Sequence, residues 1–391
     1  MYERKLGFLA RSIRGLEWLS AAEIRARLGA EITGVGHREV HFELPNIHSG
    51  LAELSTVDDV FLNCGQIDDI DHRRTSLHSL AEKAEKLEFA KTLAEVEKTR
   101  LIWYPKRFGV VASFLGRRNY NRFEIETALG GVIANQCNAV MQTLTARDNT
   151  DVSWRIHLQG HQAYVGLRLF SKPLHRRTYK SVSRTGTLYP PIASAMALLV
   201  GLWSDTRFLD PFCGVGTIGI EAAKLNSMIQ PIASDIDSSV ILLAQGNAKL
   251  ANVPIHFLAA DAGKLPFDYR SLDRIACNIP WGQTVECKGT LSSSTMPFWQ
   301  EAGRILHSGG RAVFLSEAVE PTDNQLREAK LYLVLRTRIR IRGRWAYLSV
   351  CVPDSQRNPT PIDEYGKFGE ALLKQWDSYD DTVNQSATRT V

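Results

Sequence analysis

The second half of the chain alternates regularly between two hydrophobic periods. Apolar residues recur every three or four positions in segments that we predict to be helices, at 192–203, 216–226, 238–251 and 296–307. Short apolar runs between them predict strands at 206–210, 231–235, 254–258, 273–278 and 310–316. This order indicates an α/β fold with a doubly wound, mostly parallel sheet, and a last pair of segments, 330–342 and 345–352, predicts an antiparallel hairpin at its edge.

The first half mixes the same periods less regularly. We predict a strand in "KLGFLARSI" and an amphipathic helix in "RGLEWLSAAEIRARLG" that ends at Gly29. One long charged helix is predicted over "SLHSLAEKAEKLEFAKTLAEVEKT", and a hairpin in "VSWRIHLQGHQAYVGLRLF" that turns at Gly160. Because strands and helices are mixed without strict alternation, this half belongs to the α+β class.

These patterns divide the chain into five parts. The stretch 172–190 is polar, basic and rich in turn-forming residues, and we interpret it as a linker between the two halves. The last stretch is polar, which predicts a partly disordered tail. The predicted boundaries are 1–65 and 66–171 for two α+β domains, 172–190 for the linker, 191–355 for the doubly wound domain and 356–391 for the tail.

Composition narrows the classes of function. A chain of 391 residues, 44% of them apolar, can form two or three domains with cores of their own. The net charge of +5 is small, so a polyanionic partner must bind local clusters of basic residues. The N-terminus lacks the apolar stretch of a signal peptide, and no apolar run is long enough to span a bilayer. We therefore expect a cytoplasmic monomer with no membrane partner.

The cysteines are scattered along the sequence, with no C-x-x-C pair and no histidine at ligand spacing. This pattern argues against a structural metal and against a disulfide framework, and it indicates a reducing compartment. The cysteines are Cys64, Cys137, Cys213, Cys277, Cys287 and Cys351.

A glycine-rich loop follows the first strand of the doubly wound domain. In "FLDPFCGVGTIGIEAA" the residues Gly214, Gly216 and Gly219 have the spacing G-x-G-x-x-G, which leaves NAD and S-adenosylmethionine equally open. Asp210, at the end of the strand, would repel a pyrophosphate, whereas it would attract the sulfonium and ammonium groups of S-adenosylmethionine. The alternative is that Asp210 merely caps the following helix.

Two further carboxylates follow the next strands. Asp235 is placed to accept hydrogen bonds from ribose hydroxyls, which both cofactors carry. Asp261 is placed to accept from an adenine amino group, and its alternative role is that of an ordinary turn residue. The expected cofactor-binding residues are Asp210, Phe212, Gly214, Gly216, Thr217, Asp235, Asp261 and Asn278.

The sequence "CNIPWGQ" ends the fourth predicted strand, where ligands of open α/β sheets bind. The side-chain carbonyl of Asn278 and the backbone carbonyl of Ile279 could accept two hydrogen bonds from one exocyclic amine, since Pro280 keeps the chain extended. Trp281 offers a face for a flipped base. We expect Asn278, Pro280 and Trp281 to be catalytic, and the alternative is a strand-end turn with a core tryptophan. Cys277 is interpreted as a small core residue.

Both motifs resemble known methyltransferases. "LDPFCGVGTIGIEAA" with "NIPWG" is similar to Rossmann-like amino-methyltransferases. "LARSIRGLEWLSAAEI", "FGVVASFLGRRNYNRFEIE" and "YVGLRLFSKPLHRRTYK" resemble the THUMP-domain RNA methyltransferases, from about residue 6 to residue 352. This resemblance implies a ferredoxin-like domain at 1–65, a THUMP RNA-binding domain at 66–171, and methylation of the N2 amine of guanosine in the acceptor stem of tRNA. Ile279 replaces the proline of the commoner N-P-P-Y motif.

Three other functions stay open at this point. The same chemistry on rRNA is the nearest alternative, because close relatives of the family act on it. An inactive RNA-binding protein and an NAD-dependent oxidoreductase are the other two. The presence of a set of site residues that includes Asp210 and Asn278 argues against an inactive protein. The basic first half of the chain argues against an oxidoreductase.

Basic residues form clusters that suit RNA phosphates. The expected RNA-binding residues are Arg117 and Arg118 in the THUMP-like region and Lys172, His175, Arg176, Arg177 and Lys180 in the linker. A third cluster, "RTRIRIRGR", places Arg336, Arg338, Arg340 and Arg342 on one face of a predicted strand. This strand either binds RNA or is a solvated edge strand that its charges protect against aggregation.

Overall fold

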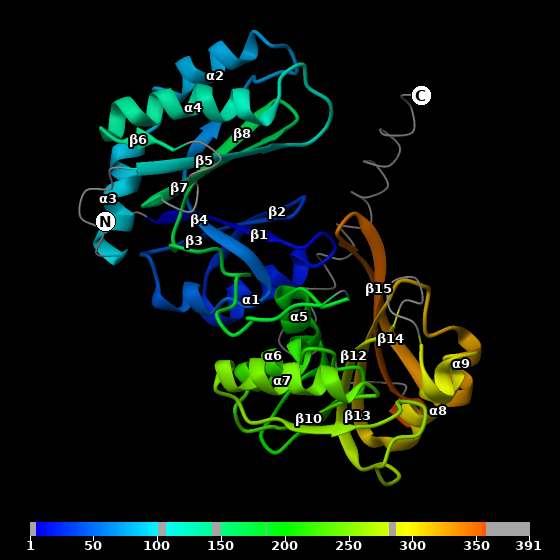
Figure 1. Cartoon of the computed structure of the whole chain (residues 1–391). Helices are drawn as coiled ribbons and strands as arrows, with labels where there is room; N and C mark the ends of the chain where they lie inside the picture. The colour runs from blue at the N-terminus through cyan, green and yellow to red at the C-terminus, as the bar shows by residue number, and fades with distance from the viewer. Residues whose placement is uncertain (1–4, 101–106, 143–149, 185, 281–286, 357–391) are drawn as a thin grey trace. The chain divides into compact units, whose positions relative to one another are not determined.

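The computed structural model describes residues 5–100, 107–142, 150–184, 186–280 and 287–356 (Figure 1). The chain forms two compact units. Unit 1 contains residues up to Arg11 together with Ile24–Leu174, and unit 2 contains Ser12–Glu23 together with the chain from His175 onward. Within the described ranges, no helix combines the length and the apolar character needed to cross a membrane.

Unit 1 is built on one eight-stranded sheet with the order β2-β3-β1-β4-β8-β7-β5-β6. The hairpin β7–β8 turns at Gly160, whose φ of 57° lies in the left-handed region, as the sequence predicts. The strands are β1 (Leu6–Ser12), β2 (Glu31–Gly36), β3 (Glu39–Leu44), β4 (Val57–Ile67), β5 (Arg107–Phe114), β6 (Val140–Met141), β7 (Val152–Gln159) and β8 (Gln162–Arg168). The helices are α1 (Glu17–Leu28), which continues into unit 2, α2 (Ser76–Ala84), α3 (Phe89–Arg100) and α4 (Arg122–Cys137).

The single long helix predicted over 76–99 is wrong, because the chain breaks between α2 and α3. Gln136 of α4 holds the break: its Oε1 accepts from the backbone N–H of Phe89 at 3.2 Å, and its Nε2 donates to the carbonyl of Glu85 at 3.0 Å. The ring of Phe89 is fully buried and packs edge-on against Trp154. A tertiary contact therefore overrides the local helix pattern.

Unit 2 contains a seven-stranded sheet with the order β11-β10-β9-β12-β13-β15-β14. The first five strands of this order are parallel and β15 runs antiparallel to its neighbours, which confirms the predicted doubly wound sheet with an edge hairpin. The strands are β9 (Arg207–Asp210), β10 (Gln230–Asp235), β11 (His256–Ala259), β12 (Leu272–Asn278), β13 (Leu306–Ser316), β14 (Leu331–Ile341) and β15 (Arg344–Pro353). The helices are α5 (Pro190–Val200), α6 (Thr217–Leu225), α7 (Ser238–Ala251), α8 (Met296–Ile305) and α9 (Asp323–Ala329).

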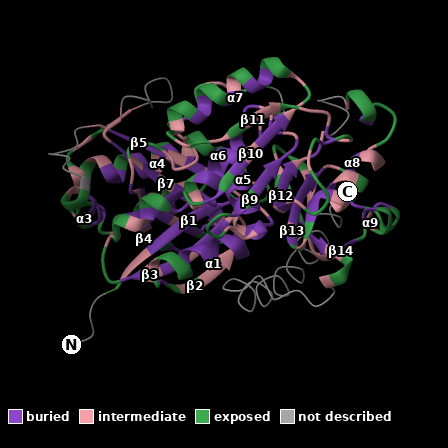
Figure 2. Ribbon diagram, turned by 90° about the horizontal axis from the view of Figure 1, so that it is seen from below, coloured by how far each residue is buried: buried purple, intermediate pink, exposed green. Residues whose placement is uncertain are grey.

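The core of unit 2 lies on both faces of this sheet, and Figure 2 shows β9, β12 and β13 buried along most of their length. On one face, Leu16 and Leu19 of the N-terminal segment pack in the same cluster as Ile192 and Leu199 of α5. Residues Ser12–Glu23 lie in unit 2, within the range 1–65 of the first predicted domain, and the predicted domain boundaries stay a prediction.

The segment Ser12–Glu23 is fixed along the edge strand β14. The backbone N–H of Arg340 donates to the carbonyl of Arg14 at 2.9 Å. At Gly15 the φ is 93°, and a Cβ atom would stand 2.0 Å from the carbonyl oxygen of Arg338. Only glycine fits at this position.

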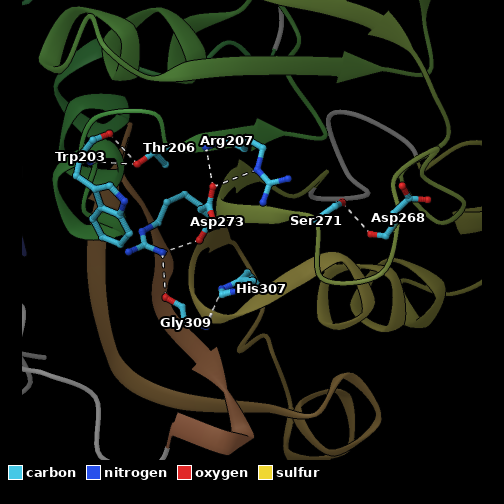
Figure 3. Close-up of polar contacts among 9 residues, drawn as sticks. Trp203, Thr206, Arg207, Asp268, Ser271, Asp273, His307 and Gly309 are labelled. Carbon is cyan, nitrogen blue, oxygen red and sulfur yellow. Dashed lines mark hydrogen bonds and ion pairs between the residues drawn. The ribbon is translucent and has the colours of Figure 1, made fainter.

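Arginines at the amino edge of the same sheet are held by protein groups (Figure 3). The backbone N–H and Nε of Arg207 both donate to Oδ2 of Asp273, at 2.9 and 3.4 Å. The guanidinium of Arg274 lies 3.6 Å from the ring centre of Trp203 and donates to the carbonyls of Gly201 and Gly309. These contacts hold both arginine side chains at the amino edge of the sheet.

Candidate functional site

The order of strands in unit 2 changes direction between β9 and β12. These strands are neighbours in the sheet, with Leu209 opposite Ile275, and β10 lies on the other side of β9, with Ala233 opposite Asp210. Ligands of open α/β sheets bind at such a switch point, at the carboxyl ends of the strands. The fold therefore brings the predicted residues Asp210, Asp235 and Asn278 to one edge.

The glycine-rich loop turns from β9 into α6. Gly214 and Gly216 have φ angles of 50° and 83°, and Gly216 is the N-cap residue of α6. A Cβ atom at Gly216 would lie 3.2 Å from Cβ of Ala244, so this glycine permits close helix packing. At Gly214 a Cβ atom would meet nothing within 4 Å, so the backbone here faces open space. Thr217 is the first residue of α6 and is buried.

Asp210, the last residue of β9, is a buried carboxylate. Its side chain is 1% exposed, and Oδ1 accepts from the backbone N–H of Phe212 at 3.2 Å. Oδ2 is buried and has no hydrogen-bond partner among the described residues. Burial, and secondarily the nearby charge of Asp235, raise the pKa of Asp210 well above its ordinary value. A buried carboxylate with an unmatched oxygen suits a cationic ligand.

Asp235 and Asp261 already bind backbone groups. Asp235 accepts from the N–H of Gly214 and from the N–H of Asp237, each at 3.0 Å. Asp261 accepts from the N–H of Thr290 at 2.8 Å, from its hydroxyl at 2.7 Å and from the N–H of Gly263 at 3.0 Å. Burial raises the pKa of Asp261, but these hydrogen bonds outweigh it and hold the pKa below the ordinary value. A carboxylate oxygen can accept more than one hydrogen bond, so these contacts leave both residues able to bind a ligand as well. The ribose contact of Asp235 and the adenine contact of Asp261 stay predictions.

Asn278 is the last residue of β12 and is half-buried, as is Pro280. Between them, Ile279 is buried, and its N–H donates to the carbonyl of Leu315 at 2.9 Å, which fixes the backbone at the strand end. Trp281 lies outside the described residues. Cys277 is fully buried in the core, and burial raises the pKa of its thiol, which confirms that it is a core residue.

Phe212 lies between the glycine loop and α8. Its ring packs edge-on against Phe298, with ring centres 5.0 Å apart. Among the described residues, no cluster of histidine, cysteine, aspartate or glutamate side chains has a geometry that could hold a metal ion.

The predicted RNA-binding cluster of the linker divides into exposed and buried residues. Lys172 and Arg176 are exposed. Arg177 is only 12% exposed, and its Nε donates to Glu221 at 3.0 Å. Lys180 donates to the carbonyl of Leu188 at 2.6 Å, and burial, together with Arg342 and Arg177, lowers its pKa to about 8 against the opposing effect of Glu221.

The other predicted basic residues show the same division. His175 packs against the ring of Tyr189, with ring centres 5.2 Å apart. In unit 1, Arg117 is exposed, whereas Arg118 donates to the carbonyls of Ile70, Asp71 and Gly160. Arg118 and Arg177 therefore stabilise the fold in addition to any role at the surface.

The arginine strand "RTRIRIRGR" forms most of β14 and the turn to β15. Thr337 and Ile339 are buried, while Arg338 and Arg340 are exposed, which confirms the predicted alternation at these four positions. Arg336 is half-buried and donates to the hydroxyl of Ser349 at 3.1 Å, and Arg342 follows the last residue of β14. Two residues that the sequence does not single out, Arg14 and Trp345, lie beside these arginines. The sequence indicates a place near these arginines only for Trp345, which lies close to the predicted hairpin turn.

The domain in unit 2 is similar to known methyltransferases. Residues 177–346 match the family model described as RMKL-like, methyltransferase domain (UPF0020). The chain is 36% identical over 164 residues to the tRNA (guanine(6)-N2)-methyltransferase of Thermus thermophilus, a match that covers 41% of this chain and 49% of that protein. It is 35% identical over 162 residues to the U6 snRNA (guanine-N(2))-methyltransferase THUMPD2 of Homo sapiens, covering 41% of this chain and 31% of that protein. The matches thus span about half or less of the length of these curated relatives.

Solved structures extend the likeness of the fold. The crystal structure of TrmN from Thermus thermophilus superposes with a TM-score of 0.70 and 25% identity, covering 89% of this chain and 99% of that chain. A predicted N6-adenine-specific DNA methylase from Listeria monocytogenes superposes with a TM-score of 0.65 and 18% identity, covering 89% of this chain and 96% of that one, and shows the fold alone. These findings confirm the Rossmann-like methyltransferase fold predicted for the second half, while the separate ferredoxin-like and THUMP domains stay predictions.

The raised pKa of Asp210 predicts how stability depends on pH. The folded protein binds this proton more tightly than the unfolded chain, so the stabilisation is complete below about pH 3.9 and is lost as the pH rises through the raised pKa. The variant Asp210→Asn carries no charge. Its free energy of unfolding should therefore rise relative to the wild type across this window, by about 1.4 kcal/mol for each pH unit between the two pKa values. Urea denaturation at a series of pH values measures the difference, and a wild type that is the more stable protein at neutral pH would contradict the prediction.

Proposed function

We propose that this chain is an S-adenosylmethionine-dependent RNA methyltransferase that modifies the exocyclic N2 amine of a guanosine in tRNA. The observation that carries the proposal is the pairing of two features on neighbouring strands. A buried carboxylate with an unmatched oxygen, Asp210, ends β9, and the motif Asn278–Pro280 ends β12. The first feature suits a cationic methyl donor and the second suits an amine.

The residues of the glycine loop fit the donor. Asp210 would face its positively charged groups, and the open space at Gly214 leaves room for it beside the backbone. Asp235 and Asp261 would accept hydrogen bonds from its nucleoside. When bound, S-adenosylmethionine supplies a methyl group on a sulfonium sulfur, which an amine nitrogen can attack. An NAD pyrophosphate would instead place negative charge near Asp210.

The residues at the end of β12 fit the acceptor. The side-chain carbonyl of Asn278 and the backbone carbonyl of Ile279 would accept the two N–H groups of the amine. This geometry orients the nitrogen and stabilises the positive charge that develops on it. The extra proton of the methylated amine then passes to water, so that no general base is required. Trp281 would provide the stacking surface for the flipped base.

The relatives support an RNA substrate. One methylates tRNA and another U6 snRNA, both at guanine N2 by their names. We take tRNA, at the acceptor stem, as the substrate of this chain, with the predicted THUMP domain as the RNA-binding part. An rRNA substrate is the second candidate, and the presence of both Asp210 and Asn278 argues against an inactive RNA-binding protein. We expect the chain to act as a cytoplasmic monomer.

Replacing Asn278 tests the amine contact. Asn278→Ala removes one of the two acceptors, so methyl transfer should fall about a hundredfold or more, while RNA binding stays close to wild type. The assay uses labelled S-adenosylmethionine with separate tRNA, rRNA and small nuclear RNA pools, followed by mass spectrometry of the nucleosides. A variant that methylates at the wild-type rate would refute the contact, and wild-type label in rRNA alone would favour the second candidate.

Two neighbouring arginines should respond differently to substitution. Arg176→Glu changes an exposed side chain, so it should weaken RNA binding and reduce its salt dependence without changing the unfolding midpoint. Arg177→Gln leaves the buried Glu221 without its ion pair, which should destabilise the fold by about 3–5 kcal/mol. RNA titrations and thermal unfolding of both variants separate the two effects. RNA affinity that is unchanged by Arg176→Glu would exclude this part of the linker from the RNA surface.

A further inference from the structure

The hairpin β14–β15 extends past the row of residues that contains Asn278. In the sheet Asn278 lies opposite Leu315, Leu315 opposite Leu348, and Leu348 opposite Thr337. Since β14 runs in the same direction as β12, the residues of β14 after Thr337 lie beyond the row that contains Asn278. The hairpin continues to Ile341, about 13 Å further at about 3.3 Å per residue. Its turn therefore overhangs the same edge of the sheet as the candidate active site.

One face of this extension is packed and the other is charged. Ile339 and Ala346 are fully buried and belong to the core of unit 2. On the opposite face, Arg340 is paired across the strands with Trp345, and Arg338 is paired with Tyr347. The predicted alternation thus directs the arginines away from the core.

Three guanidinium groups gather around one indole ring. The guanidinium carbons of Arg14, Arg338 and Arg340 lie 4.9, 5.0 and 5.4 Å from the ring centre of Trp345. Arg14 comes from the N-terminal segment. The backbone N–H of Arg340 donates to the carbonyl of Arg14, and this hydrogen bond holds the segment in place. The stacking limits the rotamers of these long side chains, so less conformational entropy is lost when they bind an anion.

Positive charge is concentrated at this edge. Among the residues that the structure describes, no carboxylate lies within ion-pair distance of Arg340 or Arg342, while Arg344 pairs with Glu317 at 3.3 Å. Lys180 lies close enough to Arg342 for the two charges to repel each other. At the amino edge, by contrast, Arg207 is neutralised by Asp273 (Figure 3). Like charges held together beside a reaction site call for an anionic partner.

We propose that Arg14, Arg338 and Arg340, which surround Trp345, together with Arg342 of the hairpin turn, bind backbone phosphates of the RNA substrate next to the target nucleotide. We call these five residues the tip cluster. The inference rests on the proposed function, because it assumes an RNA substrate at the switch point. Guanidinium groups match phosphate oxygens in geometry as well as in charge. The indole is already covered by arginines, so its role is to hold them in place and not to stack on a base.

The experiment measures the affinity of the full chain for an unmodified tRNA transcript at several salt concentrations. The test variant is Arg340→Gln/Arg342→Gln, and the matched control is Arg270→Gln, an exposed arginine stacked on Tyr269 at 5.0 Å in the loop before β12, away from the carboxyl edge. The test variant should bind the transcript at least tenfold more weakly, with a salt dependence reduced by about one to two phosphate contacts. The control should bind like the wild type.

A second pair of variants tests the role of the indole. Trp345→Leu removes the aromatic face and should weaken RNA binding several-fold, whereas Trp345→Phe keeps an aromatic face and should restore most of the affinity. Thermal unfolding and binding of S-adenosylmethionine, measured for all variants, should stay at wild-type values. Leu and Phe variants with equal RNA affinity would contradict the assignment of the indole.

The other outcomes separate this inference from the proposed function. If the arginine variant binds RNA like the wild type but associates into oligomers in size-exclusion chromatography, the arginines protect an edge strand and the inference is overturned. The proposed function survives that result as long as Asn278→Ala still lowers methyl transfer by about a hundredfold or more. If the wild-type chain does not bind the transcript at all, the inference fails together with the choice of tRNA as the substrate.

Discussion

The burial of Asp210 without a partner for one of its oxygens is the constraint on which the site depends. A carboxylate in this state is costly, because it loses its hydration and its raised pKa shows that the charged form is disfavoured. The surrounding fold nevertheless keeps Asp210 at the end of β9, opposite Ala233 and just before the glycine loop that leads into α6. A ligand with positive charge would remove that cost. The contact with Asp210 therefore favours the binding of a cationic cofactor and disfavours the binding of a phosphate group.

The sheet order connects this carboxylate to the rest of the chemistry. Because β12 lies beside β9, the proposed acceptor motif at Asn278 comes to the same edge. Because β13 and β15 follow in the sheet, the arginine hairpin continues past this motif. The N-terminal segment completes the arrangement by packing on α5 and by bringing Arg14 to Trp345. Residues from three distant parts of the sequence thus meet at one side of one domain.

Much of this arrangement could be predicted from the sequence, because it depends on local patterns. The strand–helix alternation, the turn at Gly160 and the position of Asp210 follow from spacing alone. Contacts between distant residues could not be predicted in this way. Gln136 accepts a hydrogen bond from the N–H of Phe89, where the predicted charged helix is interrupted. Arg177, which the sequence predicts to lie at the surface, forms an ion pair with the buried Glu221. Arg14 shows no sign in the sequence that it would meet Trp345.

The most direct test of the account is calorimetric titration of the full chain with S-adenosylmethionine and with NAD⁺, each in buffers of different ionisation enthalpy. In mildly acidic solution we predict that S-adenosylmethionine binds and that Asp210 releases a proton, because a cation beside this carboxylate lowers its raised pKa. NAD⁺ should not bind. Uptake of NAD⁺ without uptake of the sulfonium compound would contradict the central claim.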